Sequence, residues 1–295
     1  MYRTLNAALR ERFGCKVYKL SLPGGTTCPN RDGTCGTGGC IFCSGSSEFA
    51  AAGDTVADQL RAARQRVAAK AGPDARYIAY FQSFTATYAP LAVQEARFSA
   101  ALADPEVVAL SIATRPDCLP PEVLDLLARL RREKPVFVEL GLQTVHPASA
   151  RWMRRGYDLP VYDAAVRALH DRGLEVVTHM IAGLPGETRA KTAETARYIG
   201  ASGAEGIKIH LLHVLRGTDL AVEYAAGRVP VLTPEEYLET VAACLRVLPP
   251  EVVIHRLTGD GDKRTLLAPL WSADKKAVLN ALNRALRDVV QGELL

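Results

Sequence analysis

Four of the seven cysteines in this chain lie within sixteen residues, in the segment CPNRDGTCGTGGCIFC at 28–43. Thiolates are ligands of both zinc and iron–sulfur centres, so this segment is the strongest candidate for a metal site. An odd number of cysteines, four of them bunched, does not resemble the disulfide framework of a secreted domain. The segment therefore predicts a metal centre in a protein of a reducing compartment.

The number of cysteines that bind the metal separates two kinds of centre. Zinc on all four cysteines would form a closed tetrahedral site with a structural role. A [4Fe–4S] cluster on three of them would leave its fourth iron open to a substrate or cofactor, as metal catalysis requires. The glycines between the cysteines would let the backbone wrap closely around a bulky cluster, and Phe42 would shield it from water. These residues alone leave both centres open.

Apolar, β-branched runs recur along the chain and alternate with amphipathic helical patterns. Near-continuous hydrophobic strands of this kind are typical of parallel sheets covered on both faces. Six such strands are predicted, at residues 17–22, 76–82, 107–114, 136–144, 174–183 and 206–214. Strands and helices that alternate with right-handed crossovers form a doubly wound sheet or a complete or partial barrel, and periodicity does not choose between them.

The pattern changes after the sixth predicted strand. A helix begins at TPEE, where Thr233 is the expected N-cap and Glu236 closes a capping box. A short strand at 252–257 and a closing helix at about 273–290 follow. Because fewer than fifty residues make a poor separate core, we expect residues 1–250 to form the main domain and residues 251–295 a C-terminal extension packed on it.

The metal segment stands directly after the first predicted strand, and polar residues or glycines end several others. Enzymes with a βα barrel build their active sites at the carboxyl ends of the strands. Gln143 ends the fourth strand, and His179 with the turn GLPGET at 183–188 ends the fifth. Together these strand ends predict a rim able to hold a nucleoside and an amino acid. Glu139, in the middle of a strand, is either a ligand contact or a satisfied core carboxylate.

Composition sets further limits on the class of protein. The hydrophobic share of 48% and the charged share of 23% are near globular averages. No apolar run approaches the roughly 18 residues that a membrane span needs, and the N-terminus lacks the pattern of a secretory signal. We therefore expect a cytoplasmic protein that does not bind membranes. The net charge of +4 permits an RNA partner without arguing for one.

Six motifs resemble those of radical S-adenosylmethionine (SAM) enzymes, and the resemblance runs from about residue 13 to residue 286. They are CPNRDGTCGTGGCIFC, YFQSFTATYAP, SIATRPDCL, ELGLQT, GLPGET and HRLTGDGDKRTLLAPLW. The chain is most similar to the group that contains the Elongator catalytic subunit and oxygen-independent coproporphyrinogen oxidase, and within it to the bacterial YhcC/YtqA branch. The resemblance implies an α/β fold, a partial TIM barrel of six βα units.

The same resemblance implies the cofactors and the residues that hold them. A [4Fe–4S] cluster would cleave SAM reductively to a 5′-deoxyadenosyl radical, with a flavodoxin or ferredoxin-type protein as electron donor. The cluster ligands would be Cys28, Cys40 and Cys43, and Cys35 occupies a variable position. Residues carried over to the SAM site are Tyr18 beside the cluster, Gln82 and Thr85 at the methionine moiety, Gln143 and Arg155 at the ribose or carboxylate, His179, and Gly183 with Leu184 at the adenine. Relatives often carry a glutamate where this chain has Ala113, so Thr114 or Arg115 is expected to replace that contact.

The expected substrate is tRNA at the side chain of a wobble uridine, because both the Elongator subunit and the YtqA branch point that way by resemblance. Remodelling of an existing 5-substituent is expected rather than acetyl-CoA-dependent carboxymethylation. One alternative is a radical SAM enzyme that acts on a small metabolite or a porphyrin-like acid. The other is a non-catalytic RNA-binding protein stabilised by zinc.

Overall fold

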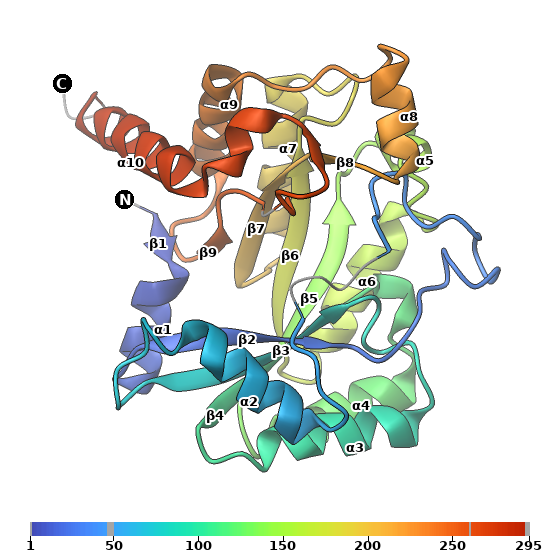
Figure 1. Cartoon of the computed structure of the whole chain (residues 1–295), viewed down its shortest axis with the longest axis vertical. Coiled ribbons are helices and arrows are strands. Elements are labelled where there is room, and N and C mark those ends of the chain that lie inside the picture. The colour runs from blue at the N-terminus through green and yellow to red at the C-terminus, as the bar shows by residue number, and fades with distance from the viewer. Residues whose placement is uncertain (1, 46–49, 260, 293–295) are drawn as a thin grey trace.

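Eight parallel strands form one curved sheet in the computed structural model, which describes residues 2–45, 50–259 and 261–292. Across the sheet the order is β1 (Arg3–Thr4), β9 (Val253–Arg256), β7 (Gly206–Leu211), β6 (Glu175–Ala182), β5 (Val136–Gln143), β4 (Val107–Thr114), β3 (Arg76–Ser83) and β2 (Val17–Pro23). The strands change direction steadily from β2 to β7, so that the sheet curls around an interior (Figure 1). This is the expected partial barrel, and β2 to β7 are its six predicted strands.

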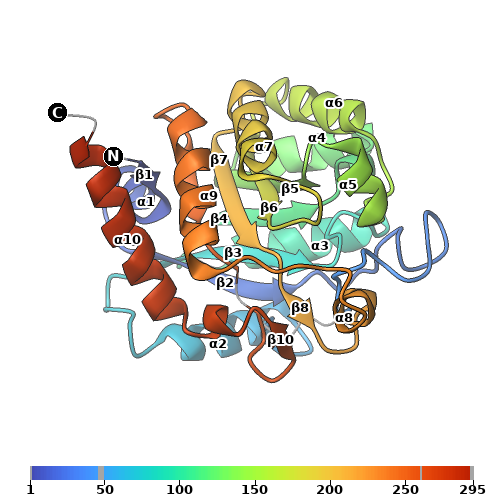
Figure 2. The ribbon, with the colours of Figure 1, turned by 90° about the horizontal axis from the view of Figure 1, so that it is seen from above.

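Helices cover the outer side of the sheet, as they must where strands are apolar on both faces (Figure 2). The helices are α1 (Leu5–Phe13), α2 (Val56–Val67), α3 (Leu91–Leu102), α4 (Pro121–Leu130), α5 (Pro147–Trp152), α6 (Leu159–His170), α7 (Arg189–Ala201), α8 (Asp219–Ala225), α9 (Pro234–Val247) and α10 (Lys275–Gly292). In the part of the chain that the structure describes, none of them combines the length and the apolar character that crossing a bilayer would need.

One predicted strand boundary is wrong. The sixth strand was expected to run to residue 214, but β7 ends at Leu211, and a separate strand β8 (Val214–Leu215) pairs antiparallel with β10 (Leu266–Ala268). The apolar run continues past the end of β7 because Leu212 and Val214 are buried in a second hydrophobic cluster, which also contains Ile41 of the cysteine segment. The continuous apolar run therefore indicated that these residues are buried, but it did not indicate where the strand ends.

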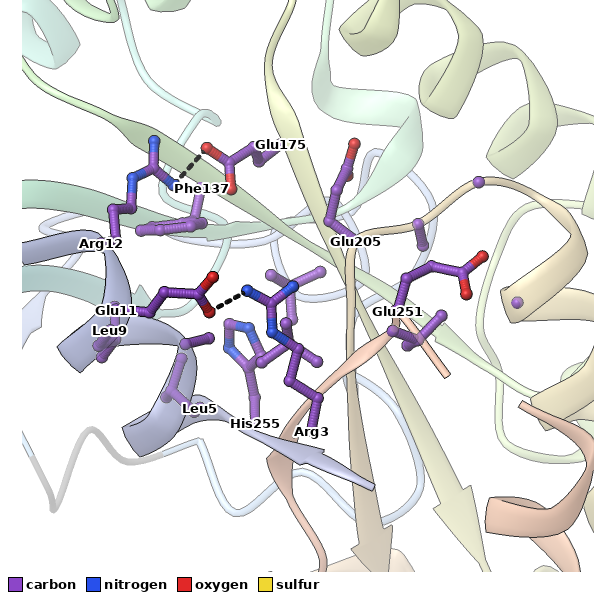
Figure 3. Close-up of a pocket in the computed structure, with 17 residues that line it drawn as sticks. Arg3, Leu5, Leu9, Glu11, Arg12, Phe137, Glu175, Glu205, Glu251 and His255 are labelled. Carbon is purple, nitrogen blue, oxygen red and sulfur yellow. Dashed lines mark hydrogen bonds and ion pairs between the residues drawn. The ribbon is translucent and has the colours of Figure 1, made fainter. Parts of the chain in front are cut away.

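The floor of the barrel is apolar. Helix α1 lies under the amino ends of the strands. Its Leu9 packs against inward-facing residues near the amino ends of five strands. These residues are Val17, Ile78, Ala109, Phe137 and Val177. Beyond this floor lies a cavity of about 590 Å³. Figure 3 shows it between α1 and the strands, with the ion pairs Arg3–Glu11 and Arg12–Glu175 at its wall.

The C-terminal stretch is joined to the sheet. The short predicted strand is confirmed as β9, which pairs with β7 on one side and with the N-terminal β1 on the other. The closing helix is confirmed as α10, whose Val278 and Leu282 are buried in the main core. The division at residue 250 stays a prediction, and residues 260 and 293–295 of the extension lie outside the described residues.

The capping box of α9 is formed as predicted, and it gives a first test of the fold. Thr233 Oγ1 accepts from the Glu236 N–H at 3.2 Å, while the Glu236 carboxylate accepts from the Thr233 N–H at 2.8 Å. We expect Thr233→Ala to lower the free energy of unfolding by about 1 kcal/mol, measured by urea denaturation. Glu235→Ala in the same turn is the control and should change it by less than half as much. Equal losses would contradict the cap.

Candidate active site

The cysteine segment leaves the barrel at the carboxyl end of β2 and is tied at once to β3. The Gly24 N–H donates to Ser83 O at 2.6 Å, and a Cβ at residue 24 would lie 2.1 Å from the same oxygen. Only glycine fits this approach. Thr26 Oγ1 donates to Thr85 O at 2.9 Å, and the Thr85 N–H donates to Thr27 O at 3.3 Å. The base of the segment is therefore fixed to the strand end that carries Thr85.

Asn30, near the start of the segment, anchors it to the chain after α5. Its side-chain amide donates to Arg154 O at 2.6 Å and to Arg155 O at 3.2 Å. Its backbone carbonyl accepts from the Gly39 N–H at 2.6 Å. The same amide lies 3.4 Å from Cys40 Sγ. A single buried asparagine thus holds both halves of the segment and points a donor at one cysteine sulfur.

Three of the four cysteines influence one another. Burial raises the pKa of Cys40 to about 11, and the charges of Cys43 and Cys28 act in the same direction. Arg31 donates to Cys43 Sγ at 3.6 Å. Cys35, by contrast, is exposed. Among the described residues, no three cysteine, histidine or acidic side chains form a group that could hold a metal as they stand, so the ligand set Cys28, Cys40 and Cys43 stays a prediction.

The donor set fits a thiolate-bound cluster. Such a cluster binds deprotonated cysteines, and N–H groups near the sulfurs stabilise the thiolate form and tune its potential. The Asn30 amide and the Arg31 guanidinium supply these donors. Arg115 also lies near the segment. Burial would lower the pKa of its guanidinium, but the ion pair with Asp117, with a smaller contribution from Cys28, outweighs burial and raises that pKa. The guanidinium donates to Asp117 and to Arg155 O, and the expected contact of this strand end with SAM stays a prediction.

The other predicted strand ends gather on the same edge of the sheet, because parallel strands all point one way. Gln82 lies at the end of β3 and Gln143 at the end of β5, where a register irregularity and a φ of 69° redirect its side chain. Gly183, with a φ of 91°, follows β6, and Leu184 is buried in the second hydrophobic cluster with Ile41. Their contacts with SAM remain predictions.

Arg155 has contacts that the sequence did not predict. Its side chain is buried and donates through Nη1 to Leu142 O at 3.0 Å and Thr144 O at 2.7 Å, and through Nε to Tyr157 O at 3.0 Å. These bonds fix the end of β5, next to Gln143. Since its own carbonyl accepts from Asn30, Arg155 links that strand end to the cysteine segment. We therefore assign it a positioning role.

The placement of Tyr18 beside the cluster is wrong. Tyr18 is the second residue of β2, at the amino end of the barrel, and its hydroxyl donates to Lys70 O. At roughly 3.3 Å per residue it lies about 16 Å along the strand from Pro23, the last residue of β2, and the cysteine segment follows beyond that strand end. Side chains alternate along a strand, so Lys19 points into the barrel and Tyr18 packs against the outer core instead.

A polar layer crosses the interior of the barrel between the apolar floor and the cysteine segment. We use this name for six side chains, one from each strand from β2 to β7, which hydrogen bonds connect. They are Lys19, Tyr80, Ser111, Glu139, His179 and Lys208. His179, predicted at the SAM site, belongs to this layer. The sequence analysis missed Lys19 and Lys208, although a lysine inside an apolar strand is a signal that burial requires a partner.

Glu139 is the centre of the polar layer. Its carboxylate accepts from Lys19 Nζ at 2.5 Å, from Ser111 Oγ at 2.5 Å, from His179 Nε2 at 2.7 Å and from Lys208 Nζ. Burial alone would raise the pKa of Glu139, but the two ammonium groups outweigh it and hold that pKa well below its usual range. Of the two roles that the sequence left open for Glu139, the structure therefore shows the satisfied core carboxylate, because residues of the chain itself supply all of these hydrogen bonds.

Comparison with known proteins now adds to this geometry. The model of the radical SAM superfamily matches residues 26–199, and that of the radical SAM C-terminal domain matches residues 204–288. The chain is 45% identical to the uncharacterized protein YtqA of Bacillus subtilis over 290 residues, 97% of this chain and 90% of that one. It is 40% identical to protein YhcC of Escherichia coli, over 97% and 93% of the two chains.

The chain belongs to the radical SAM superfamily. It is therefore an iron–sulfur-dependent enzyme whose cofactors are a [4Fe–4S] cluster and SAM, which removes the non-catalytic alternative. Among solved structures, the archaeal Methanocaldococcus infernus Elp3 with an N-terminal deletion aligns with a TM-score of 0.66 at 19% identity. The alignment covers 85% of this radical SAM enzyme and 58% of the Elp3 chain, and it supports the shared fold.

Proposed function

We propose that this radical SAM enzyme remodels the 5-substituent of a wobble uridine in tRNA. The observation that carries the proposal is a groove of about 520 Å³ on the outer side of the cysteine segment. One wall is the glycine-rich backbone of residues 36–39, and the other carries Arg151 of α5 and Arg154 just after that helix. Arginines beside an open backbone are typical of phosphate contacts, which position a nucleic acid without reading its sequence.

A flipped base would connect this groove with the barrel interior. Enzymes that modify a base in a polynucleotide take the base out of its stack into a pocket and keep the backbone outside. Here the backbone would lie along the groove, and the base would enter over the cysteine segment to reach the carboxyl ends of the strands. The likeness of the fold to Elp3 and the resemblance to the Elongator group support the same class of substrate.

The cofactors and the residues of the chain would have different roles in this reaction. The cluster and SAM, when bound, supply the one-electron chemistry that starts hydrogen abstraction. Cys28, Cys40 and Cys43 would hold the cluster, Asn30 and Arg155 fix the segment and the neighbouring strand end, and the buried clusters around Leu184 exclude water. A flavodoxin or ferredoxin-type donor would supply the electron. We place this reaction in the cytoplasm, where tRNA and such donors occur.

Mass spectrometry of tRNA nucleosides tests the substrate. In a deletion strain of the native host, we expect one modified wobble uridine to disappear and its precursor to accumulate in its place. Complementation with the wild-type gene should restore the modified nucleoside, and complementation with the Cys40→Ala variant should not. An unchanged set of wobble uridines in the deletion strain would contradict tRNA as the substrate and would favour a small metabolite or a porphyrin-like acid.

A further inference from the structure

The polar layer brings two lysine amines to one carboxylate, and burial lowers the pKa of Lys208 to about 7, so this amine is only partly charged at neutral pH. Lys19 and Lys208 face a single carboxylate, that of Glu139. His179 adds no charge at neutral pH, because burial and the neighbouring charge of Lys208 lower its pKa to about 4. Arg256 of β9 lies close enough to contribute to the potential at Lys208 and at His210. An anion bound beside Lys208 would favour the charged form of this amine, because a nearby opposite charge raises the pKa of an amine.

Two hydrogen-bonding groups at the layer point to a ligand. Lys208 Nζ has three N–H donors, and the described contacts use two of them, on Glu139 and on Tyr80 Oη at 3.1 Å. His210, two residues further along β7, stacks on His179 with the ring centroids 5.1 Å apart. Its Nε2 is buried and has no hydrogen-bond partner in the described part of the chain. Buried polar atoms of this kind are seldom left without a partner in native proteins.

Two side chains of the layer are partly exposed. The side chains of Lys19 and His179 are each 16% exposed, whereas those of Lys208 and Glu139 are 4% and 0% exposed. The cavity beneath the floor is not the source of this exposure, because neither residue lines it. That cavity also carries four carboxylates, of Glu11, Glu175, Glu205 and Glu251, against the two guanidinium groups of Arg3 and Arg12, so its field repels anions (Figure 3).

We propose that the polar layer binds a carboxylate carried by the substrate, with Lys208, Lys19 and His210 as the donors. A slender terminal group is required, because Lys208 is almost fully covered and a sugar–phosphate backbone is too wide to reach it. The inference rests on the proposed function in one respect, since it adds that the 5-substituent ends in a carboxylate. The layer would then fix the far end of that substituent while its nearer carbon atoms face the cofactors.

The test uses the cluster-loaded protein under anaerobic conditions, with acetate and inorganic phosphate as probes at constant ionic strength. The readout is the unfolding midpoint as a function of probe concentration, because a ligand that binds the folded state raises it by mass action. We expect saturable stabilisation by acetate. A hydrogen bond to a charged group contributes about 1.5–3 kcal/mol, so Lys208→Met should weaken acetate binding by roughly tenfold or more. Lys208→Arg should retain it.

Lys191→Met, at an exposed lysine of α7, is the matched control and should leave acetate binding unchanged. Should Lys208→Met fail to fold, His210→Phe removes no charge and is expected to weaken binding by roughly two- to tenfold. Binding of phosphate alone, binding that Lys208→Met retains, or no saturable binding by the wild type would each overturn the inference. Since no tRNA enters the experiment, these outcomes are independent of whether tRNA is the substrate.

Discussion

Alanine at Cys28, Cys40 or Cys43 is expected to abolish both cluster binding and reductive cleavage of SAM, whereas alanine at Cys35 should leave both intact. A cluster with an open iron has three protein ligands, so the loss of one thiolate removes a third of the protein bonds that hold it. Cys40 is electrostatically linked to Cys28 and Cys43 and receives the Asn30 amide, whereas Cys35 is exposed on the outer turn of the segment.

Anaerobic reconstitution with iron and sulfide measures this prediction. Iron and sulfide content, the cluster absorbance and the release of 5′-deoxyadenosine after addition of dithionite and SAM are recorded for each variant. Cys35→Ala is the matched control, since it removes a thiol from the same segment. Loss of iron in Cys35→Ala, or a wild-type protein that binds zinc in place of iron, would refute the assignment of three ligands.

Replacement of Glu139 by glutamine is expected to cause a large loss of stability. The substitution keeps the shape of the side chain but leaves the ammonium groups of Lys19 and Lys208 without their carboxylate. Breaking a buried ion pair by removing one partner costs about 3–5 kcal/mol. The free energy of unfolding from urea titration at neutral pH is the measurement. Glu175→Gln, which breaks the half-exposed pair with Arg12, should cost about 0–1 kcal/mol.

The effect of Glu139→Gln should depend on pH in a defined direction. In the folded chain the pKa of Glu139 lies well below its ordinary value of 4.5, so the unfolded chain takes up this proton first as the pH falls. The stability that the charge contributes is present above pH 4.5 and is lost progressively below it. The difference between wild type and variant should therefore shrink in acid. A difference that is constant from pH 7 to pH 3 would show that the charge of Glu139 is not its cause.

The sequence predicted the strands of the barrel well because their inward and outward faces are both buried, which makes the apolar runs long and distinct. Short pairings were missed for the opposite reason. Strand β1 has two residues, and β8 and β10 have two and three, so they leave no periodic signal. Their pairing depends on partners far away in the chain, which a local pattern does not contain.

Motifs located the carboxyl-end rim but not the interior of the barrel. A motif records residue type and spacing, so it found the cysteine segment and the turn at Gly183. It did not record which way a strand runs, and Tyr18 was placed at the wrong end. The polar layer joins one residue from each of six strands, and no pair of them is close in sequence. Only the curvature of the sheet brings Lys19 and Lys208 to the same carboxylate.

The place of β9 in the sheet has a consequence for synthesis of the chain. Residues 3 and 253 are paired, so the N-terminal strand has no partner until the last part of the protein has left the ribosome. Until then β7 is an open edge, which is a template for pairing with other chains. At roughly 5–20 residues per second this interval lasts some seconds. The nascent protein is therefore most prone to aggregate late in translation, and ribosome stalling between β7 and β9 should increase its dependence on chaperones.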